Sequence, residues 1–461
     1  MWLRFWLRLS GGLLAAGLLV CTNAVAETIT LTLKEATERA LNTDPRIVER
    51  QHFVESAEAL LKEVHGNEDW KIDGNAFLAI SPGVEGSAFE GGGCLTGNCV
   101  LRSDKYDLKK NGLSPWLNFQ LTLIKPLYTF GKVENYSAAA QANILVKEND
   151  IRIQRAATVI DVKRAYYGYL AARDGILFLE DVRTRIAKAT EVAQQWLEEG
   201  ESDIRQADIF ALQAGHSLIS RYIAQTQGME KIALEGLKVL TGTSAADELQ
   251  LADKTLTAVA LPKEVLATLQ QQALAQRPEM LQVEAGLQAR RALIEARSAD
   301  ALPNLYAGVA GVFSYSPNRD RLDNPYIYDP FNESGLIPMI GLKWDWQRGA
   351  QRAKVAQEQA ELNALIAKSS LVRNGIPFQV AEQYHQVQAE HAALKELSEG
   401  SRHARRWMVG RYADFEAGLE TADRVITAFQ GYVLTQTDYI KTTYEYNMRV
   451  AQLQNVVGMD Q

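Results

Sequence analysis

Apolar and polar residues alternate along four segments of the chain, as they do in β-strands with one apolar and one polar face. The clearest alternation is in WLNFQLTLI, at 116–124. The weakest is in NLYAGVAGVFSY, at 304–315, where small and apolar residues occupy both sides. The pattern therefore predicts strands at 70–81, 116–124, 304–315 and 336–346.

Alanine-rich, charged segments fill most of the remaining chain and predict helices. Two of them are unusually long, because a helix that covers 132–198 would extend about 100 Å at ~1.5 Å per residue. Pro377 lies inside the second long helix and removes one backbone hydrogen bond, so we expect a kink near Asn374–Pro377. The predicted helices are 33–66, 132–198, 206–241, 263–300, 350–413 and 420–457.

The last predicted helix carries a stripe at heptad spacing, which is typical of a seam between packed helices. An ordinary core helix is the alternative, but it fits a short segment better than helices of this length. The stripe consists of Ile426, Phe429, Val433, Ile440, Thr443, Val450 and Val457, with polar Gln436, Asn447 and Gln454 completing the spacing.

Short sequence matches recur in the same order in the two halves of the chain. ERALNTDP at 38–45 resembles QQALAQRP at 271–278, and LKVLTG near 240 resembles LQNVVG near 456. Each half has the same predicted layout: a helix, two strands and a long helical hairpin. We therefore predict two structural repeats, 27–246 and 247–461, which meet near LADKTLTAVALP.

The N-terminus predicts export. Arg4 and Arg8 flank an apolar run that ends in AVA at 24–26, so residues 1–26 are interpreted as a signal peptide. Cys21 would suggest a lipid anchor instead, but Val20 stands where a small residue is expected. No later uncharged apolar run approaches the ~20 residues of a membrane helix. We expect a protein that is either soluble outside the inner membrane or inserted as a closed β-barrel.

Strand length and aromatic residues favour the barrel over a soluble sandwich, because spanning strands have about 9–11 residues and end in aromatic girdles. Four strands cannot close around a lumen, whereas three chains would supply twelve. The long loops 82–114 and 317–335 would then lie at the cell exterior, and the helices in the periplasm. The aromatic residues near strand ends are Trp70, Tyr128, Phe130, Tyr315, Trp344 and Trp346.

Composition and the cysteines say less about the fold than the strand and helix patterns do. The formal charge of −7 argues against a nucleic-acid partner, and 47% hydrophobic residues indicate an ordered protein. Cys94 and Cys99 are closely spaced among glycines, which favours a small loop disulfide in an exported protein. Two free or metal-binding thiols are the alternative, although no histidine is near in the sequence.

Three segments resemble the TolC-like outer-membrane efflux protein family, and the resemblance extends over nearly all of 27–461. They are LTLKEATERALNTDPRI at 31–47, PLYTFGKVENYSAAAQA at 126–142 and GRYADFEAGLETADRVITAF at 410–429. The resemblance implies an α+β membrane protein, mostly helical, that forms a homotrimer. Its twelve-stranded barrel would lie in outer-membrane lipid of a Gram-negative cell, above a periplasmic α-barrel of long antiparallel helices.

The resemblance also implies a function. Such channels are the exit ducts of tripartite efflux or type I secretion systems, and they dock onto a periplasmic membrane-fusion adaptor and an inner-membrane pump of the RND or ABC type. We expect the adaptor at the turns, around 198–205 and 411–419. In the family, aspartates narrow the pore at these turns. Asp423 matches one such position, whereas Ile426 stands where some members carry a second aspartate.

Four acidic residues near the second turn are the candidate pore constriction. Repeated by symmetry, they would form a ring that favours cations. The alternative is that these acids only stabilise a helix start, and Glu420 fits that role well. In the barrel, Lys343 and Asp345 are expected to face the lumen. The candidate constriction residues are Asp414, Glu416, Glu420 and Asp423.

No catalytic arrangement, cofactor motif or metal-ligand spacing is recognisable. The six histidines are scattered, and abundant carboxylates on helices normally form a solvated face. A structural or adhesive helical stalk with a small soluble β-domain is the alternative function. A periplasmic enzyme has no support from residue spacing.

Overall fold

The computed structural model describes residues 28–83, 112–200, 204–319, 328–345 and 347–459. The predicted signal peptide and the candidate disulfide between Cys94 and Cys99 lie outside these residues. The chain forms two compact units, which are considered separately below. The first contains 1–43, 161–258 and 397–444, and the second contains 44–160, 259–396 and 445–461.

Among the described residues, the same order of elements occurs twice: one short strand, two short helices, two strands and two long helices. The first set is β1 (Thr28–Leu31), α1 (Leu33–Thr43), α2 (Pro45–Gly66), β2 (Lys71–Pro82), β3 (Leu113–Tyr128), α4 (Lys132–Glu199) and α5 (Gln206–Thr241). The second set is β4 (Glu248–Leu251), α6 (Leu266–Gln276), α7 (Pro278–Ala299), β5 (Asn304–Tyr315), β6 (Glu333–Lys343), α8 (Arg348–Glu416) and α9 (Ala422–Val457). The mostly helical fold class is confirmed. The duplication itself, with its boundary after residue 246, stays a prediction.

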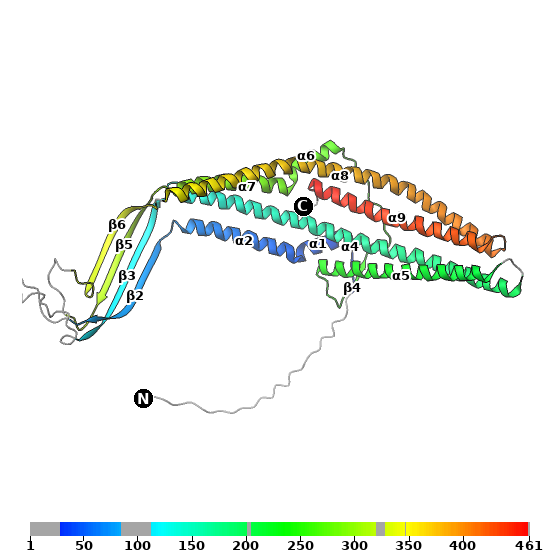
Figure 1. Ribbon diagram of the computed structural model, residues 1–461, viewed down its shortest axis with the longest axis horizontal. Helices are drawn as coiled ribbons and strands as arrows, with labels where there is room; N and C mark the ends of the chain where they lie inside the picture. The colour runs from blue at the N-terminus through cyan, green and yellow to red at the C-terminus, as the bar shows by residue number, and fades with distance from the viewer. Residues whose placement is uncertain (1–27, 84–111, 201–203, 320–327, 346, 460–461) are drawn as a thin grey trace, which may run out of the picture. The chain divides into compact units, whose positions relative to one another are not determined.

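The second unit contains an antiparallel sheet of four strands in the order β2-β3-β5-β6 (Figure 1). All four were predicted, although β3 is longer than 116–124 and β6 ends at Lys343 rather than 346. In the register, Ile72 pairs with Leu123, Leu123 with Val309, and Val309 with Pro338. Paired residues share a face of the sheet, so these rows define its two sides.

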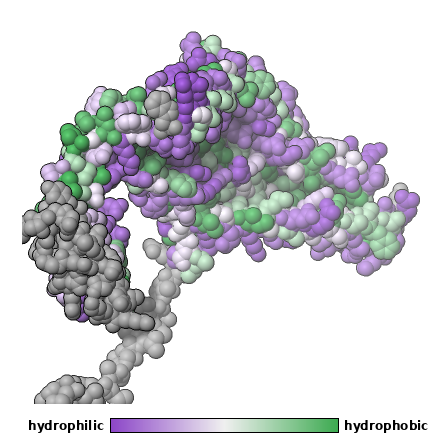
Figure 2. Space-filling model, turned by 60° about the vertical axis from the view of Figure 1, so that its left-hand side comes forward, coloured by the Kyte–Doolittle hydropathy of each residue, from purple (hydrophilic) through white to green (hydrophobic). Residues whose placement is uncertain are grey.

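One face of the sheet is apolar and uncovered by the described residues. Leu78 is 75% exposed and Leu336 is 78% exposed, although large aliphatic side chains are usually buried. Figure 2 shows hydrophobic side chains gathered over the described part of the strands. The side chains on this face include Ile72, Leu78, Ile80, Leu117, Phe119, Leu123, Val309, Phe313, Leu336, Ile340 and Leu342. We call this surface the apolar face.

The predicted helices 33–66 and 263–300 are wrong as single helices. Each is broken just before a proline, Pro45 or Pro278, which becomes the first residue of the second helix. The preceding residues, Asp44 and Arg277, have extended backbones with ψ of 114° and 131°. The proline ring disfavours the helical conformation at the residue before it, which explains both breaks.

The long helices agree with expectation at 132–199 and 348–416. The α8 assignment continues through Pro377 without interruption, and the Gln270 side chain donates a 3.0 Å hydrogen bond to the Pro377 carbonyl oxygen. The kink stays a prediction. Within the described residues, no helix combines the length and the apolar character that a membrane span requires.

In the first unit, β1 and β4 form a small parallel sheet, which the sequence did not reveal. The main core of this unit lies between α4, α5, α8 and α9, where α5 runs antiparallel to α4 and α9 runs antiparallel to α8 (Figure 1). The predicted seam of α9 contributes to it, because Phe429 is buried and Ile426 and Val433 pack against it. The core residues with the least exposure include Val182, Ala189, Leu212, Met408, Phe415, Val425 and Ala428.

Candidate functional site

In the first unit, the long helices α4 and α8 each end next to a glycine. Gly200 ends α4 with φ of 68° and Gly418 ends α8 with φ of 73°, a left-handed conformation that glycine adopts without steric cost. After α8, the backbone N–H of Gly418 bonds to Phe415 O and that of Leu419 to Asp414 O. These bonds satisfy carbonyls at the helix end. We call Gly200 with residues 204–205, and residues 417–421, the tip turns.

Side chains join the two helical hairpins just inside the tip turns. The rings of Trp196 on α4 and Phe415 on α8 lie 5.1 Å apart between centroids, and Phe415 is fully buried. Lys188 Nζ lies 3.3 Å from Glu416 Oε1, and the Tyr412 hydroxyl donates to the same carboxylate at 2.9 Å. Burial, followed by the Glu416 contact, raises the pKa of Tyr412 to about 12. Near the tip, α4 therefore contacts α8 through an aromatic pair, an ion pair and the Arg185 guanidinium, which lies 5.8 Å from the centre of the Tyr412 ring.

The four candidate constriction acids divide into two kinds. Glu420 is largely buried and forms ion pairs with Arg411 and Arg424, the latter at 3.3 Å. A hydrogen bond from the Thr421 backbone is the main cause that lowers the pKa of Glu420, aided by both arginines. Glu416 pairs with Lys188. The charges of Glu420 and Glu416 are therefore balanced by basic residues of the same chain.

Asp414 and Asp423 differ from the other two acids. Both are exposed, and no ion pair joins either of them to a residue within the described ranges. Asp423 lies in the first turn of α9, where its backbone carbonyl accepts a hydrogen bond from Thr427. These two carboxylates are therefore the stronger candidates for a cation-attracting surface.

The two barrel candidates also differ in position. Lys343 is the last residue of β6 and pairs with Asn304, on the face of the sheet opposite the apolar face. Asp73, Asn118 and Gln120 share that polar face. Asp345 lies beyond the end of β6 and accepts a 3.2 Å hydrogen bond from Gln347. Only Lys343 is thus part of a strand.

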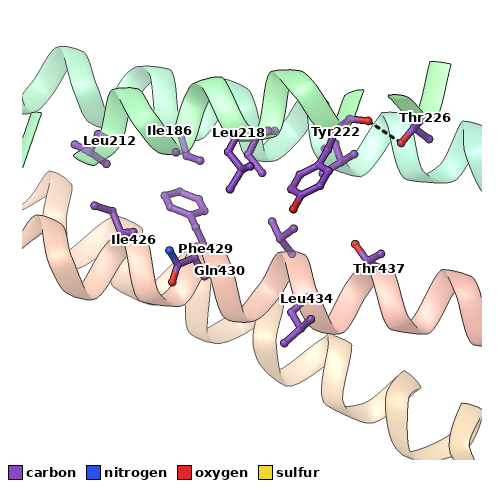
Figure 3. Close-up of a pocket in the computed structure, with 14 residues that line it drawn as sticks. Ile186, Leu212, Leu218, Tyr222, Thr226, Ile426, Phe429, Gln430, Leu434 and Thr437 are labelled. Atoms are coloured by element: carbon purple, nitrogen blue, oxygen red, sulfur yellow. Dashed lines mark hydrogen bonds between the residues drawn. The ribbon is translucent and has the colours of Figure 1, made fainter. Parts of the chain in front are cut away.

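An apolar groove of about 400 Å³ lies in the first unit between α4, α5 and α9 (Figure 3). Leu218 and Tyr222 from α5 face Phe429 of α9 across it. Further along α5 an exposed apolar stripe continues at heptad spacing, which sequence inspection could have found. The stripe consists of Leu218, Tyr222, Met229, Ile232 and Val239.

Comparison with known proteins gives matches in structure but not in sequence. No family profile matches the sequence, and no curated protein matches it significantly. Solved structures do match. CusC, studied for transmembrane channel formation, is 17% identical and covers 93% of this chain and 92% of its own, with a TM-score of 0.71. The outer-membrane channel CmeC of Campylobacter jejuni is 14% identical over 93% and 86%, with a TM-score of 0.72.

The outer-membrane channel MtrE of Neisseria gonorrhoeae, in its open state, is 15% identical over 93% of this chain and 89% of its own, with a TM-score of 0.69. The chain has a TolC-like fold. These neighbours are named as channels and not as enzymes. Within the ranges that the structure describes, no cluster of three potential metal ligands occurs.

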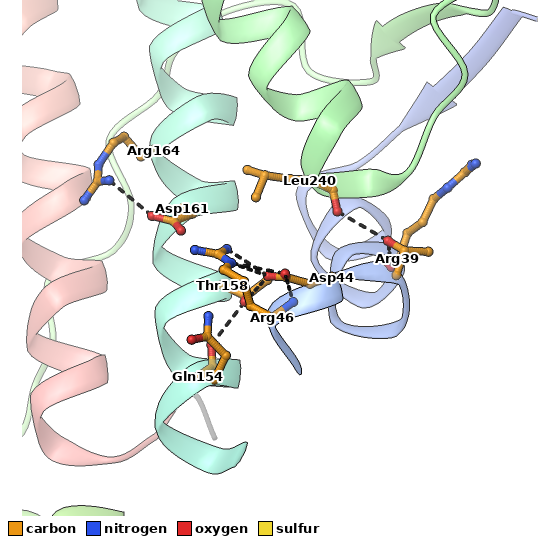
Figure 4. Close-up of polar contacts among 9 residues, drawn as sticks. Arg39, Asp44, Arg46, Gln154, Thr158, Asp161, Arg164 and Leu240 are labelled. Atoms are coloured by element: carbon orange, nitrogen blue, oxygen red, sulfur yellow. Dashed lines mark hydrogen bonds and ion pairs between the residues drawn. The ribbon is translucent and has the colours of Figure 1, made fainter. Parts of the chain in front are cut away.

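One pair of contacts in the TolC-like fold was missed by sequence reasoning. Asp44, before α2, accepts a 2.6 Å hydrogen bond from Thr158 on α4 (Figure 4). It also forms an ion pair with Arg46 at 2.8 Å. At the matching place before α7, Arg277 donates 2.7 Å to Gln379 on α8 and pairs with Glu279. We call Asp44 and Arg277, the residues just before these two prolines, the elbows. The acidic elbow residue thus bonds to α4, and the basic one bonds to α8.

Proposed function

We propose that this chain is an outer-membrane exit duct of a Gram-negative cell, serving a tripartite efflux or type I secretion system. It is a passive conduit, driven by an inner-membrane pump through a periplasmic adaptor. The observation that carries the proposal is the uncovered apolar face on a four-stranded sheet, within a fold shared with outer-membrane channels. Lipid is the environment that makes such a surface favourable.

The edges of the sheet support a closed assembly. Among the described strands, β2 and β6 each pair on one side only, so each leaves a row of backbone N–H and C=O groups unpaired. Unpaired backbone groups cost several kcal/mol each in hydrocarbon, so an open edge does not persist there. Three copies, pairing β6 of one with β2 of the next, would form a twelve-stranded ring. Lys343 then faces its lumen.

The helices offer matching support for a homotrimer. The apolar groove and the exposed stripe on α5 run at heptad spacing, which suits a helix from a neighbouring copy. An exposed stripe of this kind on a single chain is unfavourable in water. The neighbouring copy would cover it and extend the ring of strands into a tube of helices in the periplasm.

Gating is assigned to the tip turns. Three copies bring Asp414 and Asp423 together in a ring that attracts cations. The contacts of α4 with α8, through Trp196–Phe415 and Lys188–Glu416, hold the inner hairpin in place. An adaptor that binds around 198–205 and 411–419 would loosen these contacts. The pair 350–457 would then untwist and widen the ring.

Two measurements test the proposal. Detergent-extracted full-length protein should have the mass of a trimer and should form channels in a planar bilayer. Material that is monomeric, water-soluble without detergent and non-conducting would instead favour a helical stalk. In cells, deletion with parallel assays identifies the cargo class. Sensitivity to small toxic compounds indicates efflux, whereas loss of one exported polypeptide indicates secretion.

A further inference from the structure

Among the described strand residues, Lys125 is the one cation on the apolar face, at the end of the sheet next to the helices. Lys71 of β2 pairs with Ile124 of β3, so the preceding residue, Trp70, lies beside Lys125. Lys125 Nζ is 5.8 Å from the centre of the Trp70 ring. Lys125 also pairs with Ala307 on the other side. It therefore belongs to the same face as Leu123.

The charge of Lys125 is not balanced by a carboxylate of the described residues. Within the described part of the chain, no carboxylate forms an ion pair with Lys125, and its recorded contact is the Trp70 ring. Its cross-strand neighbours along the row are Ala307 and then Ile340, both apolar. An ammonium group at an apolar surface is unfavourable unless water or an anion reaches it.

The position of Lys125 along the strand indicates where that anion would come from. Trp70 is 56% exposed, and three further exposed aromatic residues lie at the same end of the sheet. Aromatic residues and lysines are enriched where a membrane meets water, because ring and ammonium reach the headgroups. Those three residues are Tyr128, Phe130 and Trp344. The apolar face thus ends in a row fitted to a membrane surface.

We propose that Lys125 and Trp70 bind the phosphate group of an anionic phospholipid in the leaflet nearest the helices. This inference rests on the proposed membrane insertion and names the lipid chemistry at that surface. The ammonium group pairs with the phosphate oxygen, while the exposed indole lies among the glycerol esters and can donate its N–H. Lys71 is excluded from this site because it lies on the other face and bonds to Asn67 at 3.3 Å.

The test measures the lipid preference of the full-length protein by native mass spectrometry from detergent. The probes are phosphatidylglycerol and phosphatidylcholine with identical acyl chains. The wild type should retain phosphatidylglycerol preferentially, and Lys125→Gln should lose about fivefold of that preference per site, the contribution of one basic residue near a charged membrane surface. Lys125→Arg should keep it, and Trp70→Leu should weaken it. Lys71→Gln is the matched control and should behave as wild type.

The outcomes separate this inference from the proposed function. A protein that conducts in bilayers but whose Lys125→Gln variant keeps the wild-type lipid preference would overturn the lipid site alone. Failure of the wild type to enter bilayers would overturn the proposed function first. Inorganic phosphate, added as a competitor, should not displace the lipid. Displacement at equal concentration would show a site for free anions and would also overturn the proposal.

Discussion

Asp44 and Arg277 occupy the same place in the two halves of the chain with opposite charges. Each stands just before a proline that begins a helix, and each contacts one long helix. Asp44, only 4% exposed, accepts a hydrogen bond from Thr158, whereas Arg277 donates one to Gln379. Position and geometry recur, but the direction of the hydrogen bond is reversed. A charge at this elbow therefore serves as an anchor irrespective of its sign.

Asp44→Ala should destabilise the protein by about 2 kcal/mol, because it removes a helix cap and a buried hydrogen bond together. The midpoint of urea unfolding, followed by circular dichroism, measures the loss. Glu38→Gln on the exposed face of α1 is the control and should change little. An Asp44→Ala midpoint equal to wild type would show that the elbow contact does not contribute.

The same residue predicts a dependence on pH. Burial alone would raise the pKa of Asp44, but hydrogen bonds from Arg46 and Thr158 outweigh burial and lower the pKa below its usual 3.8. A lowered folded pKa stabilises the protein above the unfolded pKa, and this stabilisation disappears as the pH falls through the folded value. Melting temperatures of wild type and Asp44→Asn should therefore differ near neutral pH and converge in acid. A constant difference would contradict this.

The acids at the tip should differ in their effect on ion selectivity. Asp423→Asn should lower the cation preference of the channel, because this exposed carboxylate has no partner in the described ranges. Glu420→Gln should change the preference less, because Arg411 and Arg424 already balance that charge. Reversal potentials in a salt gradient measure both. Equal shifts in the two variants would show that local pairing does not decide selectivity.

Breaking the ionic contact between α4 and α8 should favour the open channel. Lys188→Met removes the pair with Glu416 at 3.3 Å but leaves the tilted ring contact of Trp196 with Phe415. An exposed ion pair contributes at most about 1 kcal/mol, so open probability should rise by no more than about fivefold per copy. Single-channel recordings measure this. Lys368→Met, an exposed site elsewhere on α8, is the control, and a matching rise there would refute the role of Lys188.

Charge on the apolar face should impair insertion. Leu78→Arg places a cation in hydrocarbon at a cost of about 2–4 kcal/mol per strand position. Asn75→Arg, three residues earlier and on the polar face, should be tolerated. The amount of protein in outer-membrane fractions measures both. Equal amounts would indicate that the apolar face does not contact lipid.

Sequence reasoning succeeded where the signal is local and repeats. Alternation located all four strands, and composition located both long helices to within a few residues of their ends. The resemblance to TolC-like channels was confirmed at the level of fold. The helix breaks at Pro45 and Pro278 could have been predicted, because a proline disfavours the helical conformation at the residue before it. They were missed because the sequence on both sides of each proline has a helical pattern.

The features that the sequence did not reveal are mainly contacts between distant residues. Asp44 and Thr158 are separated by 114 positions, so no periodicity connects them. The short strands β1 and β4 have four residues each, too few to show alternation. The ion pair of Glu420 with Arg411 depends on the angle at which α8 returns as α9, whereas the place of Glu420 in a pore ring stays a prediction. Such geometry follows from packing and not from local pattern.

The sheet has two different edge strands, β2 and β6, and this difference predicts how mutant and normal copies behave when they are expressed together. In the proposed ring, each copy would offer its β2 edge to one neighbour and its β6 edge to the other. A mutant with a damaged β6 edge would still join through β2, and it would then block closure of the ring. When such a mutant is expressed together with the normal protein, most assemblies would include at least one mutant copy. The mutant gene would therefore behave as a dominant allele.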